Sequence, residues 1–515
     1  MVKAPEPGLN RVAEGTIPAM GKGTCRVATI RGGKRSAKRR AGRSRPVVRV
    51  GRPDASLTGL AGLVCVDELA GRLGIVTELD LAVGPVKDRD RGHTAGQLLV
   101  GMAAGLLAGQ DCLTGLDRVR ADVGSALLVQ APVQAPVPAA TTAGGLARRF
   151  DPQAHGPHRL AGIEAGLAKV YQRWLGLVPA AVRAPLVLRD PTIDCDATDI
   201  EVYGSNKDRV GWNYAGVRCG RVHLASWAQA ELPLAADLLA GNDDVRPDAP
   251  DLLRRALAVL PAQVCGRPRV RADAGYFDQS LAHAAVAQGC DYAIAAKRNP
   301  AVWRAFAAIP DDAWSDARDM PGGQVAACDY TPAGWPEGSY CIVRRVKVTA
   351  EQISADPRSR RRRTIPTGQL ALALDGQAEH AWAASFIVTN IPADDGADIV
   401  GLEAWFRRRT SIEDRFRDGK HGGGLNHLPS GDHTVNTIWT WAGLLAGALS
   451  VMGQALIGWH AHHGDRTRTP TLRHRLLTVP GRILRHARGL TLRLPAGHTA
   501  ITDALQALRA LPPPG

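Results

Sequence analysis

The sequence predicts an α/β protein, in which a domain with a mixed β-sheet is interrupted by a β-rich insertion and preceded by a helical N-terminal domain. Three observations predict it. Before residue 150, apolar residues recur at intervals of three and four. From 184 to 300, apolar runs of strand length alternate with amphipathic stretches of helix length. From 301 to 384 this order gives way to short alternating runs such as SYCIVRRVKV. With 515 residues, the chain has room for several domains.

Positive charge is concentrated at the two ends of the chain. Residues 1–50 carry a net charge of +11 and residues 460–515 a net +7, against +15 for the whole chain. Few large apolar residues accompany the first cluster, so we expect a flexible basic arm over 1–50 and a basic C-terminal region over 460–515. Basic ends on a nearly neutral body are typical of proteins that bind a polyanion, above all nucleic acid. The alternative is that the basic ends only aid solubility.

The elements between these ends follow from hydrophobic periodicity. We expect a helical DNA-binding domain over 51–150 and a connecting helix and linker over 151–183. The mixed-sheet domain occupies 184–300 and resumes after the insertion at 385–459. Its predicted order is three strands, a helix, a strand, a helix and a strand, carried by LVLRDPTIDCDATDIEVYG, VHLASWA, LPLAADLLAG, PDLLRRALAVL, RPRVRADAGYF, QSLAHAAVAQG and DYAIAAK.

Two features bear on where the protein resides. The uncharged run 434–459 has the length of a membrane span, but it contains several polar residues and follows a charged segment. We interpret it as a buried helix or helix pair, and expect no membrane association. The nine cysteines include no C-x-x-C pair, which argues against a disulfide framework or a zinc knuckle and predicts a cytoplasmic location.

Three acidic positions stand out as candidate catalytic residues. Asp194 and Asp196 are two residues apart on a predicted strand and therefore point to the same face. A divalent cation would relieve the repulsion between two such carboxylates. Asp273 ends an apolar strand, and Glu413 lies in the charged segment AWFRRRTSIEDRFRDGK.

That charged segment, 404–420, is predicted to be one long amphipathic helix. At about 100° per residue, four of its side chains fall in a sector about 60° wide: Phe406, Arg409, Glu413 and Lys420. One stripe would then present an aromatic ring, a guanidinium, a carboxylate and an ammonium group. This combination suits an anionic substrate beside a metal ion.

The chain resembles the DDE transposases of bacterial insertion sequences, in the branch with a YREK signature and a β-rich insertion before the last acidic residue. The resemblance is carried by Phe406-x2-Arg409-x3-Glu413-x6-Lys420, by D-x-D-A-T at 194–198 and by D-A-G-Y-F at 273–277. Further phrases similar to group 1 DDE-domain transposases run from about 184 to 430. The chain departs from the signature at Phe406, where the family has Tyr, which removes a hydroxyl able to bond a DNA phosphate.

The resemblance implies an RNase H-like fold in which Asp196, Asp273 and Glu413 hold two Mg²⁺ ions, with Mn²⁺ able to substitute. Asp194 competes with Asp196 for the first ligand position. Such an enzyme cuts transposon ends and joins them to target DNA by phosphodiester hydrolysis and transesterification, which two metal ions promote. Arg409 and Lys420 would bind DNA phosphates, with Phe406 beside them.

The resemblance also implies partners and a location. The partners would be double-stranded DNA, as terminal inverted repeats and as target, and a second copy in a DNA-bound homodimer. The location would be the bacterial cytoplasm, at the nucleoid.

The predicted insertion holds two further groups of candidates. Three tryptophans are either receivers of a flipped base, as in related transposases that pass through a DNA hairpin, or core residues, which is the favoured interpretation: Trp303, Trp314 and Trp335. Five arginines are expected to grip the DNA backbone: Arg358, Arg360, Arg361, Arg362 and Arg363.

Two alternatives keep the fold and change the function. The first is a catalytically inactive, DNA-binding remnant of a transposase, and the second is a metal-dependent nuclease that does not transfer strands. Because all three acidic positions are filled, the sequence favours an active enzyme over the remnant. Only the products of the reaction distinguish the nuclease.

Overall fold

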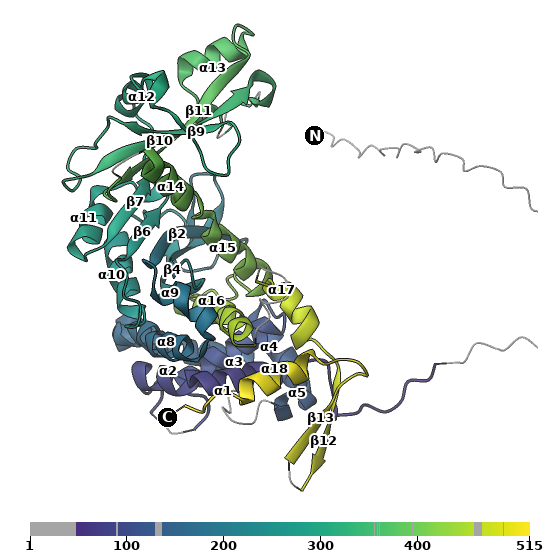
Figure 1. Cartoon of the computed structure of the whole chain (residues 1–515). Coiled ribbons are helices and arrows are strands. Elements are labelled where there is room, and N and C mark those ends of the chain that lie inside the picture. The colour runs from purple at the N-terminus through teal and green to yellow at the C-terminus, as the bar shows by residue number, and fades with distance from the viewer. Residues whose placement is uncertain are drawn as a thin grey trace, which may run out of the picture. The chain divides into compact units, whose positions relative to one another are not determined.

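The computed structural model describes residues 48–88, 91–128, 136–354, 356–357, 359, 361–393, 396–457, 466–487 and 489–514 (Figure 1). The chain divides into two compact units, 1–53 and 54–515, and the second contains every element described below. Apart from 48–50, the predicted basic arm lies outside the described residues, as do Arg358 and Arg360.

Helices make up most of the chain before the sheet. Gly74, with φ at 65°, separates the first two of them, and a capping box between Thr94 and Gln97 starts α3. The elements are β1 (Leu57–Thr58), α1 (Leu63–Leu73), α2 (Ile75–Val83), α3 (Ala95–Leu107), α4 (Leu113–Ala121), α5 (Val123–Leu128), α6 (Ala140–Ala147), η1 (Arg148–Phe150), α7 (Pro152–His155), α8 (His158–Leu177) and α9 (Ala180–Val187). The helical region thus extends past residue 184, and the sheet begins only at Thr192.

A ten-stranded mixed sheet forms the centre of the protein. Its first part contains β2 (Thr192–Glu201), β3 (Gly211–Trp212), β4 (Arg218–Trp227), β5 (Leu232–Ala240), β6 (Arg269–Ala272) and β7 (Asp291–Ala295). Strand β2 is antiparallel to β4 and parallel to β6, and β6 is parallel to β7. Helices α10 (Ala249–Val259), η2 (Ala274–Tyr276) and α11 (Gln279–Ala287) connect these strands. The predicted mixed sheet is confirmed.

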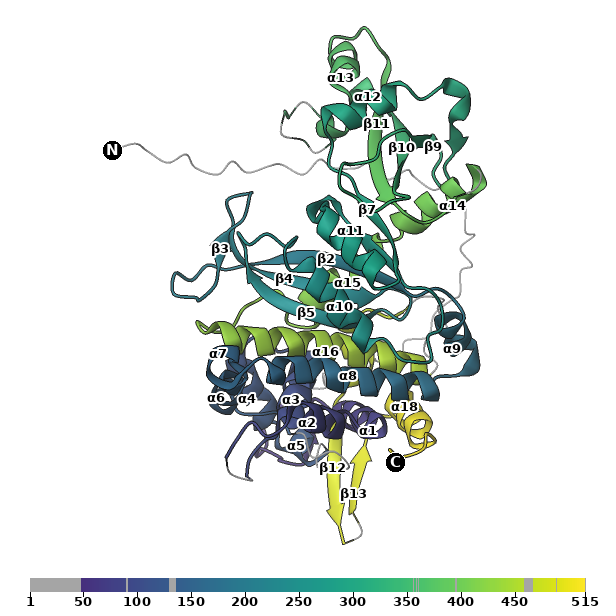
Figure 2. The same cartoon turned by 90° about the vertical axis from the view of Figure 1, so that its left-hand side faces the viewer.

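The long helix α16 (His433–Ile457) lies beside α8, between the sheet and the N-terminal helices (Figure 2). Tyr171 and Trp174 of α8 fix this layer, because Tyr171 donates to the carbonyl of Pro233 on β5 and Trp174 to that of Met452 on α16. By length and composition α16 could cross a membrane, but 83% of its most apolar stretch is buried within the chain. Burial to this extent is typical of a core helix.

The segment predicted as an insertion continues the same sheet. It contains α12 (Pro300–Ala307), η3 (Asp311–Ala313), β8 (Ser315–Asp316), β9 (Gly323–Cys328), β10 (Tyr340–Thr349), η4 (Ala350–Gln352), η5 (Arg362–Thr364), α13 (Thr367–Leu374) and β11 (His380–Thr389). Strand β11 pairs with β10 along its whole length and with β7 through Ile387–Thr389. The sheet therefore runs without interruption from β4 to β8.

The C-terminal region packs against the N-terminal helices. It contains α17 (Thr469–Leu472), η7 (Arg473–Leu477), β12 (Gly481–His486), β13 (Gly489–Arg493) and α18 (Ala500–Arg509). Strand β12 pairs with β1, and Arg509 of α18 forms a 3.1 Å ion pair with Glu68 of α1. Arg72 of α1 in turn donates to the carbonyl of Leu511.

Candidate functional site

Two neighbouring parallel strands place the predicted aspartates side by side. In the register of β2 and β6, Asp194 lies opposite Arg271 and Cys195 opposite Ala272. One residue further along, Asp196 and Asp273 occupy matching positions. Asp273 starts the turn η2, where its carboxylate accepts a 2.8 Å hydrogen bond from the amide of Gly275. A Cβ at position 275 would lie 2.8 Å from that carboxylate, so a larger residue would displace the Asp273 side chain.

The predicted single helix over 404–420 is wrong. The chain forms two helices, α14 (Gly396–Arg407) and α15 (Thr410–Gly422), with a break at Arg408 and Arg409. At the break the carbonyl of Trp405 accepts the amide of Arg408 at 3.2 Å and a bond from the guanidinium of Arg271. It therefore does not accept the amide of Arg409, as it would in a continuous α-helix. The amide of Arg409 bonds the carbonyl of Phe406 instead. The stripe calculated for a continuous helix therefore does not include Phe406.

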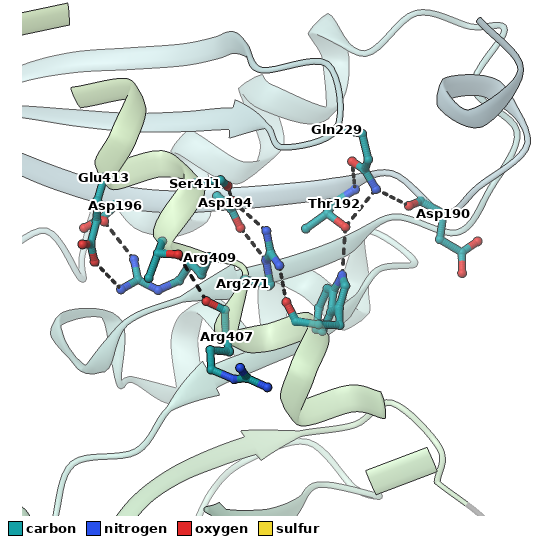
Figure 3. Close-up of polar contacts among 12 residues, drawn as sticks. Asp190, Thr192, Asp194, Asp196, Gln229, Arg271, Arg407, Arg409, Ser411 and Glu413 are labelled. Carbon is teal, nitrogen blue, oxygen red and sulfur yellow. Dashed lines mark hydrogen bonds and ion pairs between the residues drawn. The ribbon is translucent and has the colours of Figure 1, made fainter. Parts of the chain in front are cut away.

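Asp194 is fully buried in an ion pair with Arg271 (Figure 3). Its two oxygens accept from Nε and Nη2 of Arg271 at 2.6 and 2.9 Å, and Ser411 of α15 donates to it at 3.4 Å. Burial raises the pKa of Asp194, and the bonds from Arg271 oppose that rise. Both oxygens of Asp196 also accept hydrogen bonds, from the amide of Ala197 and from Arg409 at 2.8 Å each. The two aspartates differ in exposure, because the side chain of Asp194 is 0% and that of Asp196 13% exposed.

Asp196 shares one arginine with Glu413. Nη1 of Arg409 lies 2.8 Å from Asp196, and Nη2 lies 3.6 Å from Glu413 (Figure 3). Burial raises the pKa of Asp196 to about 6, with the charge of Arg409 lowering it and that of Asp273 raising it further. Electrostatic coupling to both aspartates also raises the pKa of Arg409 against the effect of burial. The three predicted catalytic residues and Arg409 therefore form one neighbourhood.

Lys420 and Phe406 lie at the margins of this neighbourhood. The ammonium of Lys420 donates a 2.8 Å bond to the carbonyl of Asp199, near the end of β2, and burial lowers its pKa. Phe406 is partly buried in the last turn of α14. The structure thus joins Lys420 to β2 but separates Phe406 from α15 by the helix break.

The three tryptophans of the insertion pack in aromatic clusters. Trp303 contacts Phe306 and Phe386 edge-on, and the ring of Trp335 lies 4.9 Å from that of Phe277. Trp314 covers the guanidinium of Arg345, whose other side faces Trp382. All three are partly buried against the main core.

The described part of the arginine cluster lies at the far tip of the insertion. Arg361, just before η5, and Arg363, within it, are exposed. This short helix follows β10 and contacts β11. Strand β11 meets β7 only at its C-terminal end, seven residues from its start, or roughly 23 Å along an extended strand. The cluster and the carboxylates are therefore separate surfaces.

The donor atoms suit Mg²⁺, but their arrangement does not form a metal site. Asp196, Asp273 and Glu413 offer the carboxylate oxygens that a hard cation prefers. Within the described ranges, however, no group of three or more His, Cys, Asp or Glu side chains is placed to hold a metal ion. The guanidinium of Arg409 lies within ion-pair distance of two of the three carboxylates, those of Asp196 and Glu413.

Sequence reasoning missed Arg271 and Ser411, the two partners of Asp194. The available signal was an arginine within the apolar strand RVRADA, two residues before Asp273. A charged side chain in a buried strand requires a counter-charge nearby. The sequence did not identify Asp194 as that counter-charge, because the two residues are 77 positions apart.

Fold and site together define a class of protein. The RNase H-like mixed sheet, its β-rich extension and the helical N-terminal region agree with the predicted fold class. Within this fold, aspartates on two neighbouring parallel strands lie near a glutamate on α15. Residues 41–358 and 370–513 match the model of the transposase DDE domain family, group 1. The chain belongs to this family.

Comparisons with individual proteins add little to this assignment. No curated protein matches the chain. Among solved structures, the chain is similar to a cryo-EM structure of piggyBac transposase in a synaptic complex with hairpin DNA. The identity is 10% and the TM-score 0.37, and the similarity covers 81% of this chain and 79% of that chain.

Proposed function

We propose that this protein is an active transposase, which binds the ends of a DNA transposon, cuts them and joins them to target DNA. Within the family, we assign it to the insertion-sequence branch with a YREK-like signature. It uses Mg²⁺, as two ions for which Mn²⁺ substitutes, and it works as a DNA-bound homodimer in the bacterial cytoplasm, at the nucleoid. Its DNA substrates are the terminal inverted repeats and the target duplex.

One observation carries this proposal: Asp196, Asp273 and Glu413 come from two neighbouring strands and a facing helix, with Arg409 among them. Carboxylates grouped in this way repel one another and are costly to maintain without a cationic ligand. Arg409 and Lys420 supply positive charge on the same side of the sheet, where a DNA phosphate would be held. The exposed arginines Arg361 and Arg363 provide a second contact with the backbone, remote from the carboxylates.

Each residue then has a distinct role. Asp196, Asp273 and Glu413 are the catalytic residues and the metal ligands. Arg409 binds a DNA phosphate through two parallel N–H groups of its guanidinium, and Lys420 binds one through the single charge of its ammonium group. Asp194 is a positioning residue, because its pair with Arg271 fixes both β2 and the end of α14.

The test is incubation of the purified protein with Mg²⁺ and labelled DNA that carries the element's own ends. We expect end cleavage and joining, and their loss in Asp273→Asn. The matched control is Asp278→Asn, since Asp278 also accepts the amide two residues ahead, at 2.9 Å, but only caps α11. This control should cleave like the wild type, which separates catalysis from the turn-forming role of an aspartate.

Other outcomes identify the two alternatives. Sequence-specific binding of the ends without cleavage in Mg²⁺ or Mn²⁺ would indicate an inactive remnant. Cleavage without joined products would indicate a nuclease. Equal activity of Asp273→Asn and the wild type would contradict the assignment of the site.

A further inference from the structure

Arg409 projects from a backbone break that a second arginine creates. Because Arg271 takes the carbonyl of Trp405, α14 ends and Arg409 lies at the start of α15 rather than within a continuous helix. Its guanidinium therefore points back to β2, where it meets Asp196 (Figure 3). The break sets the direction of the Arg409 side chain.

The guanidinium lies between two carboxylates that the proposed chemistry needs together. It is 2.8 Å from Asp196 and 3.6 Å from Glu413, and the side chain is only 14% exposed. A cation in this place lowers the repulsion that the carboxylates would otherwise exert on each other. A divalent ion held by these carboxylates would need the oxygens that the guanidinium now contacts.

The two ion-pair contacts of Arg409 with these carboxylates differ in length. Only the bond to Asp196 has hydrogen-bond length, while the contact with Glu413 exceeds it and Glu413 is 54% exposed. A phosphate accepts two parallel bonds from the guanidinium fork, so it is a better partner than one distant carboxylate oxygen.

We propose that Arg409 occupies the metal position in the DNA-free protein, and that a phosphate of bound DNA must draw it away before Asp196, Asp273 and Glu413 bind a divalent ion. The inference rests on the proposed function, because it assumes that these carboxylates bind metal on DNA. It adds an order of binding, in which the protein binds DNA before it binds the divalent ion. By linkage, each ligand then raises the affinity of the other by the same factor.

The test measures Mn²⁺ binding by electron paramagnetic resonance, without any turnover. In the absence of DNA, Arg409→Gln should bind Mn²⁺ at least about tenfold more tightly than the wild type, since it lacks the competing charge. The control is Arg417→Gln, which removes one positive charge from an exposed pair on the same helix and should match the wild type. Adding Asp273→Asn to Arg409→Gln should abolish the gain.

A 20-base-pair duplex supplies the second arm. It should tighten Mn²⁺ binding by the wild type about tenfold or more, and leave Arg409→Gln nearly unchanged, because the coupling requires the arginine. Arg409→Lys, whose single ammonium cannot bridge both carboxylates, should give an intermediate affinity without DNA. Thermal unfolding of each variant verifies that it is folded.

Two results would overturn the proposal: equal Mn²⁺ affinity of the wild type and Arg409→Gln without DNA, or equal tightening of both by the duplex. A gain that survives Asp273→Asn would place the ion elsewhere and overturn it as well. Failure of the proposed function is recognised separately, because it appears as absence of end cleavage by the wild type in the product assay.

Discussion

Two aspartates of β2, Asp194 and Asp196, lie two residues apart and each pairs with an arginine from another element. The two ion pairs differ in burial and in the number of short hydrogen bonds. Arg271 and Asp194 are 3% and 0% exposed and form two short bonds, and Arg271 also lies over the ring of Trp405 at 5.1 Å. Arg409 and Asp196 are 14% and 13% exposed and form one short bond, and the second nitrogen reaches toward Glu413.

The fold is expected to depend more strongly on the buried ion pair than on the partly exposed one. A buried charge that loses its only partner is strongly destabilising, so Asp194 and Arg271 depend on each other for the fold. Asp196 shares its partner and borders solvent, so its ion pair can be exchanged for another. The alternation of side chains along the strand thus does not distinguish the two aspartates, whereas their burial and contacts do.

The largest expected effect is that of Arg271→Ala. It should lower the free energy of unfolding by about 3–5 kcal/mol, because Asp194 is left buried without a counter-charge. Urea denaturation measures this loss. Arg417→Ala, which breaks an exposed pair, should cost less than about 0.5 kcal/mol.

A double variant sharpens the same point. Replacing both partners, in Asp194→Asn with Arg271→Met, should recover part of the loss, since no charge then remains unpaired. If Arg271→Ala is no more destabilising than Arg417→Ala, the contrast between the two pairs is wrong.

Asp67 of α1 is another buried carboxylate, and among the described residues no arginine or lysine pairs with it. It is 3% exposed, and neither of its oxygens has a hydrogen-bond partner among the described residues. Burial raises its pKa to about 7, and the charge of Glu68 adds to the rise. Because the folded protein binds this proton more tightly than the unfolded chain, Asp67 lowers stability progressively as the pH rises from about 4 to 7.

Asp67→Asn should therefore stabilise the protein by roughly 1–3 kcal/mol at pH 8 and have little effect near pH 4. Denaturation in urea at both pH values tests this expectation. The neighbouring Glu68 pairs with Arg72 and Arg509, so Glu68→Gln should give no such gain. A gain that is equal at both pH values would exclude titration of Asp67 as the cause.

A smaller effect on stability is expected for Arg409→Gln, below about 1.5 kcal/mol, because glutamine retains one hydrogen bond and Asp196 borders solvent. Thermal unfolding beside Arg271→Ala measures the contrast directly. A loss as large as that of Arg271→Ala would mean that Arg409 is a structural residue.

The smallest effect per residue concerns the tip of the insertion. Replacing Arg361, Arg362 and Arg363 by Gln should reduce the dependence of DNA affinity on salt by about one unit of log–log slope for each DNA phosphate that is no longer neutralised. Filter binding over a range of salt concentrations measures the slope. An unchanged slope would assign the backbone contacts to other surfaces.

Local sequence patterns predicted most helices and strands, but they did not predict which distant residues these elements contact. Strand period and the Gly-containing turn were sufficient to place Asp273 at a strand end. The run predicted at 434–459 forms a mostly buried helix as far as the structure describes it, to Ile457. The break between α14 and α15 was not predictable from residues 404–420, since its cause is Arg271 on another strand. The pairing of β11 with β7 likewise depends on residues that lie almost 100 positions apart.

The pairing of β1 with β12 has a consequence for biosynthesis. Leu57 lies opposite Arg482, and Glu68 is bound by Arg509, so the first helical layer is completed by segments made about 425 residues later. At roughly 5–20 residues per second, the ribosome needs about 20–85 s to supply them. Throughout that interval α1 lacks the α18 partner that covers it, which makes this layer a natural client for chaperones during translation.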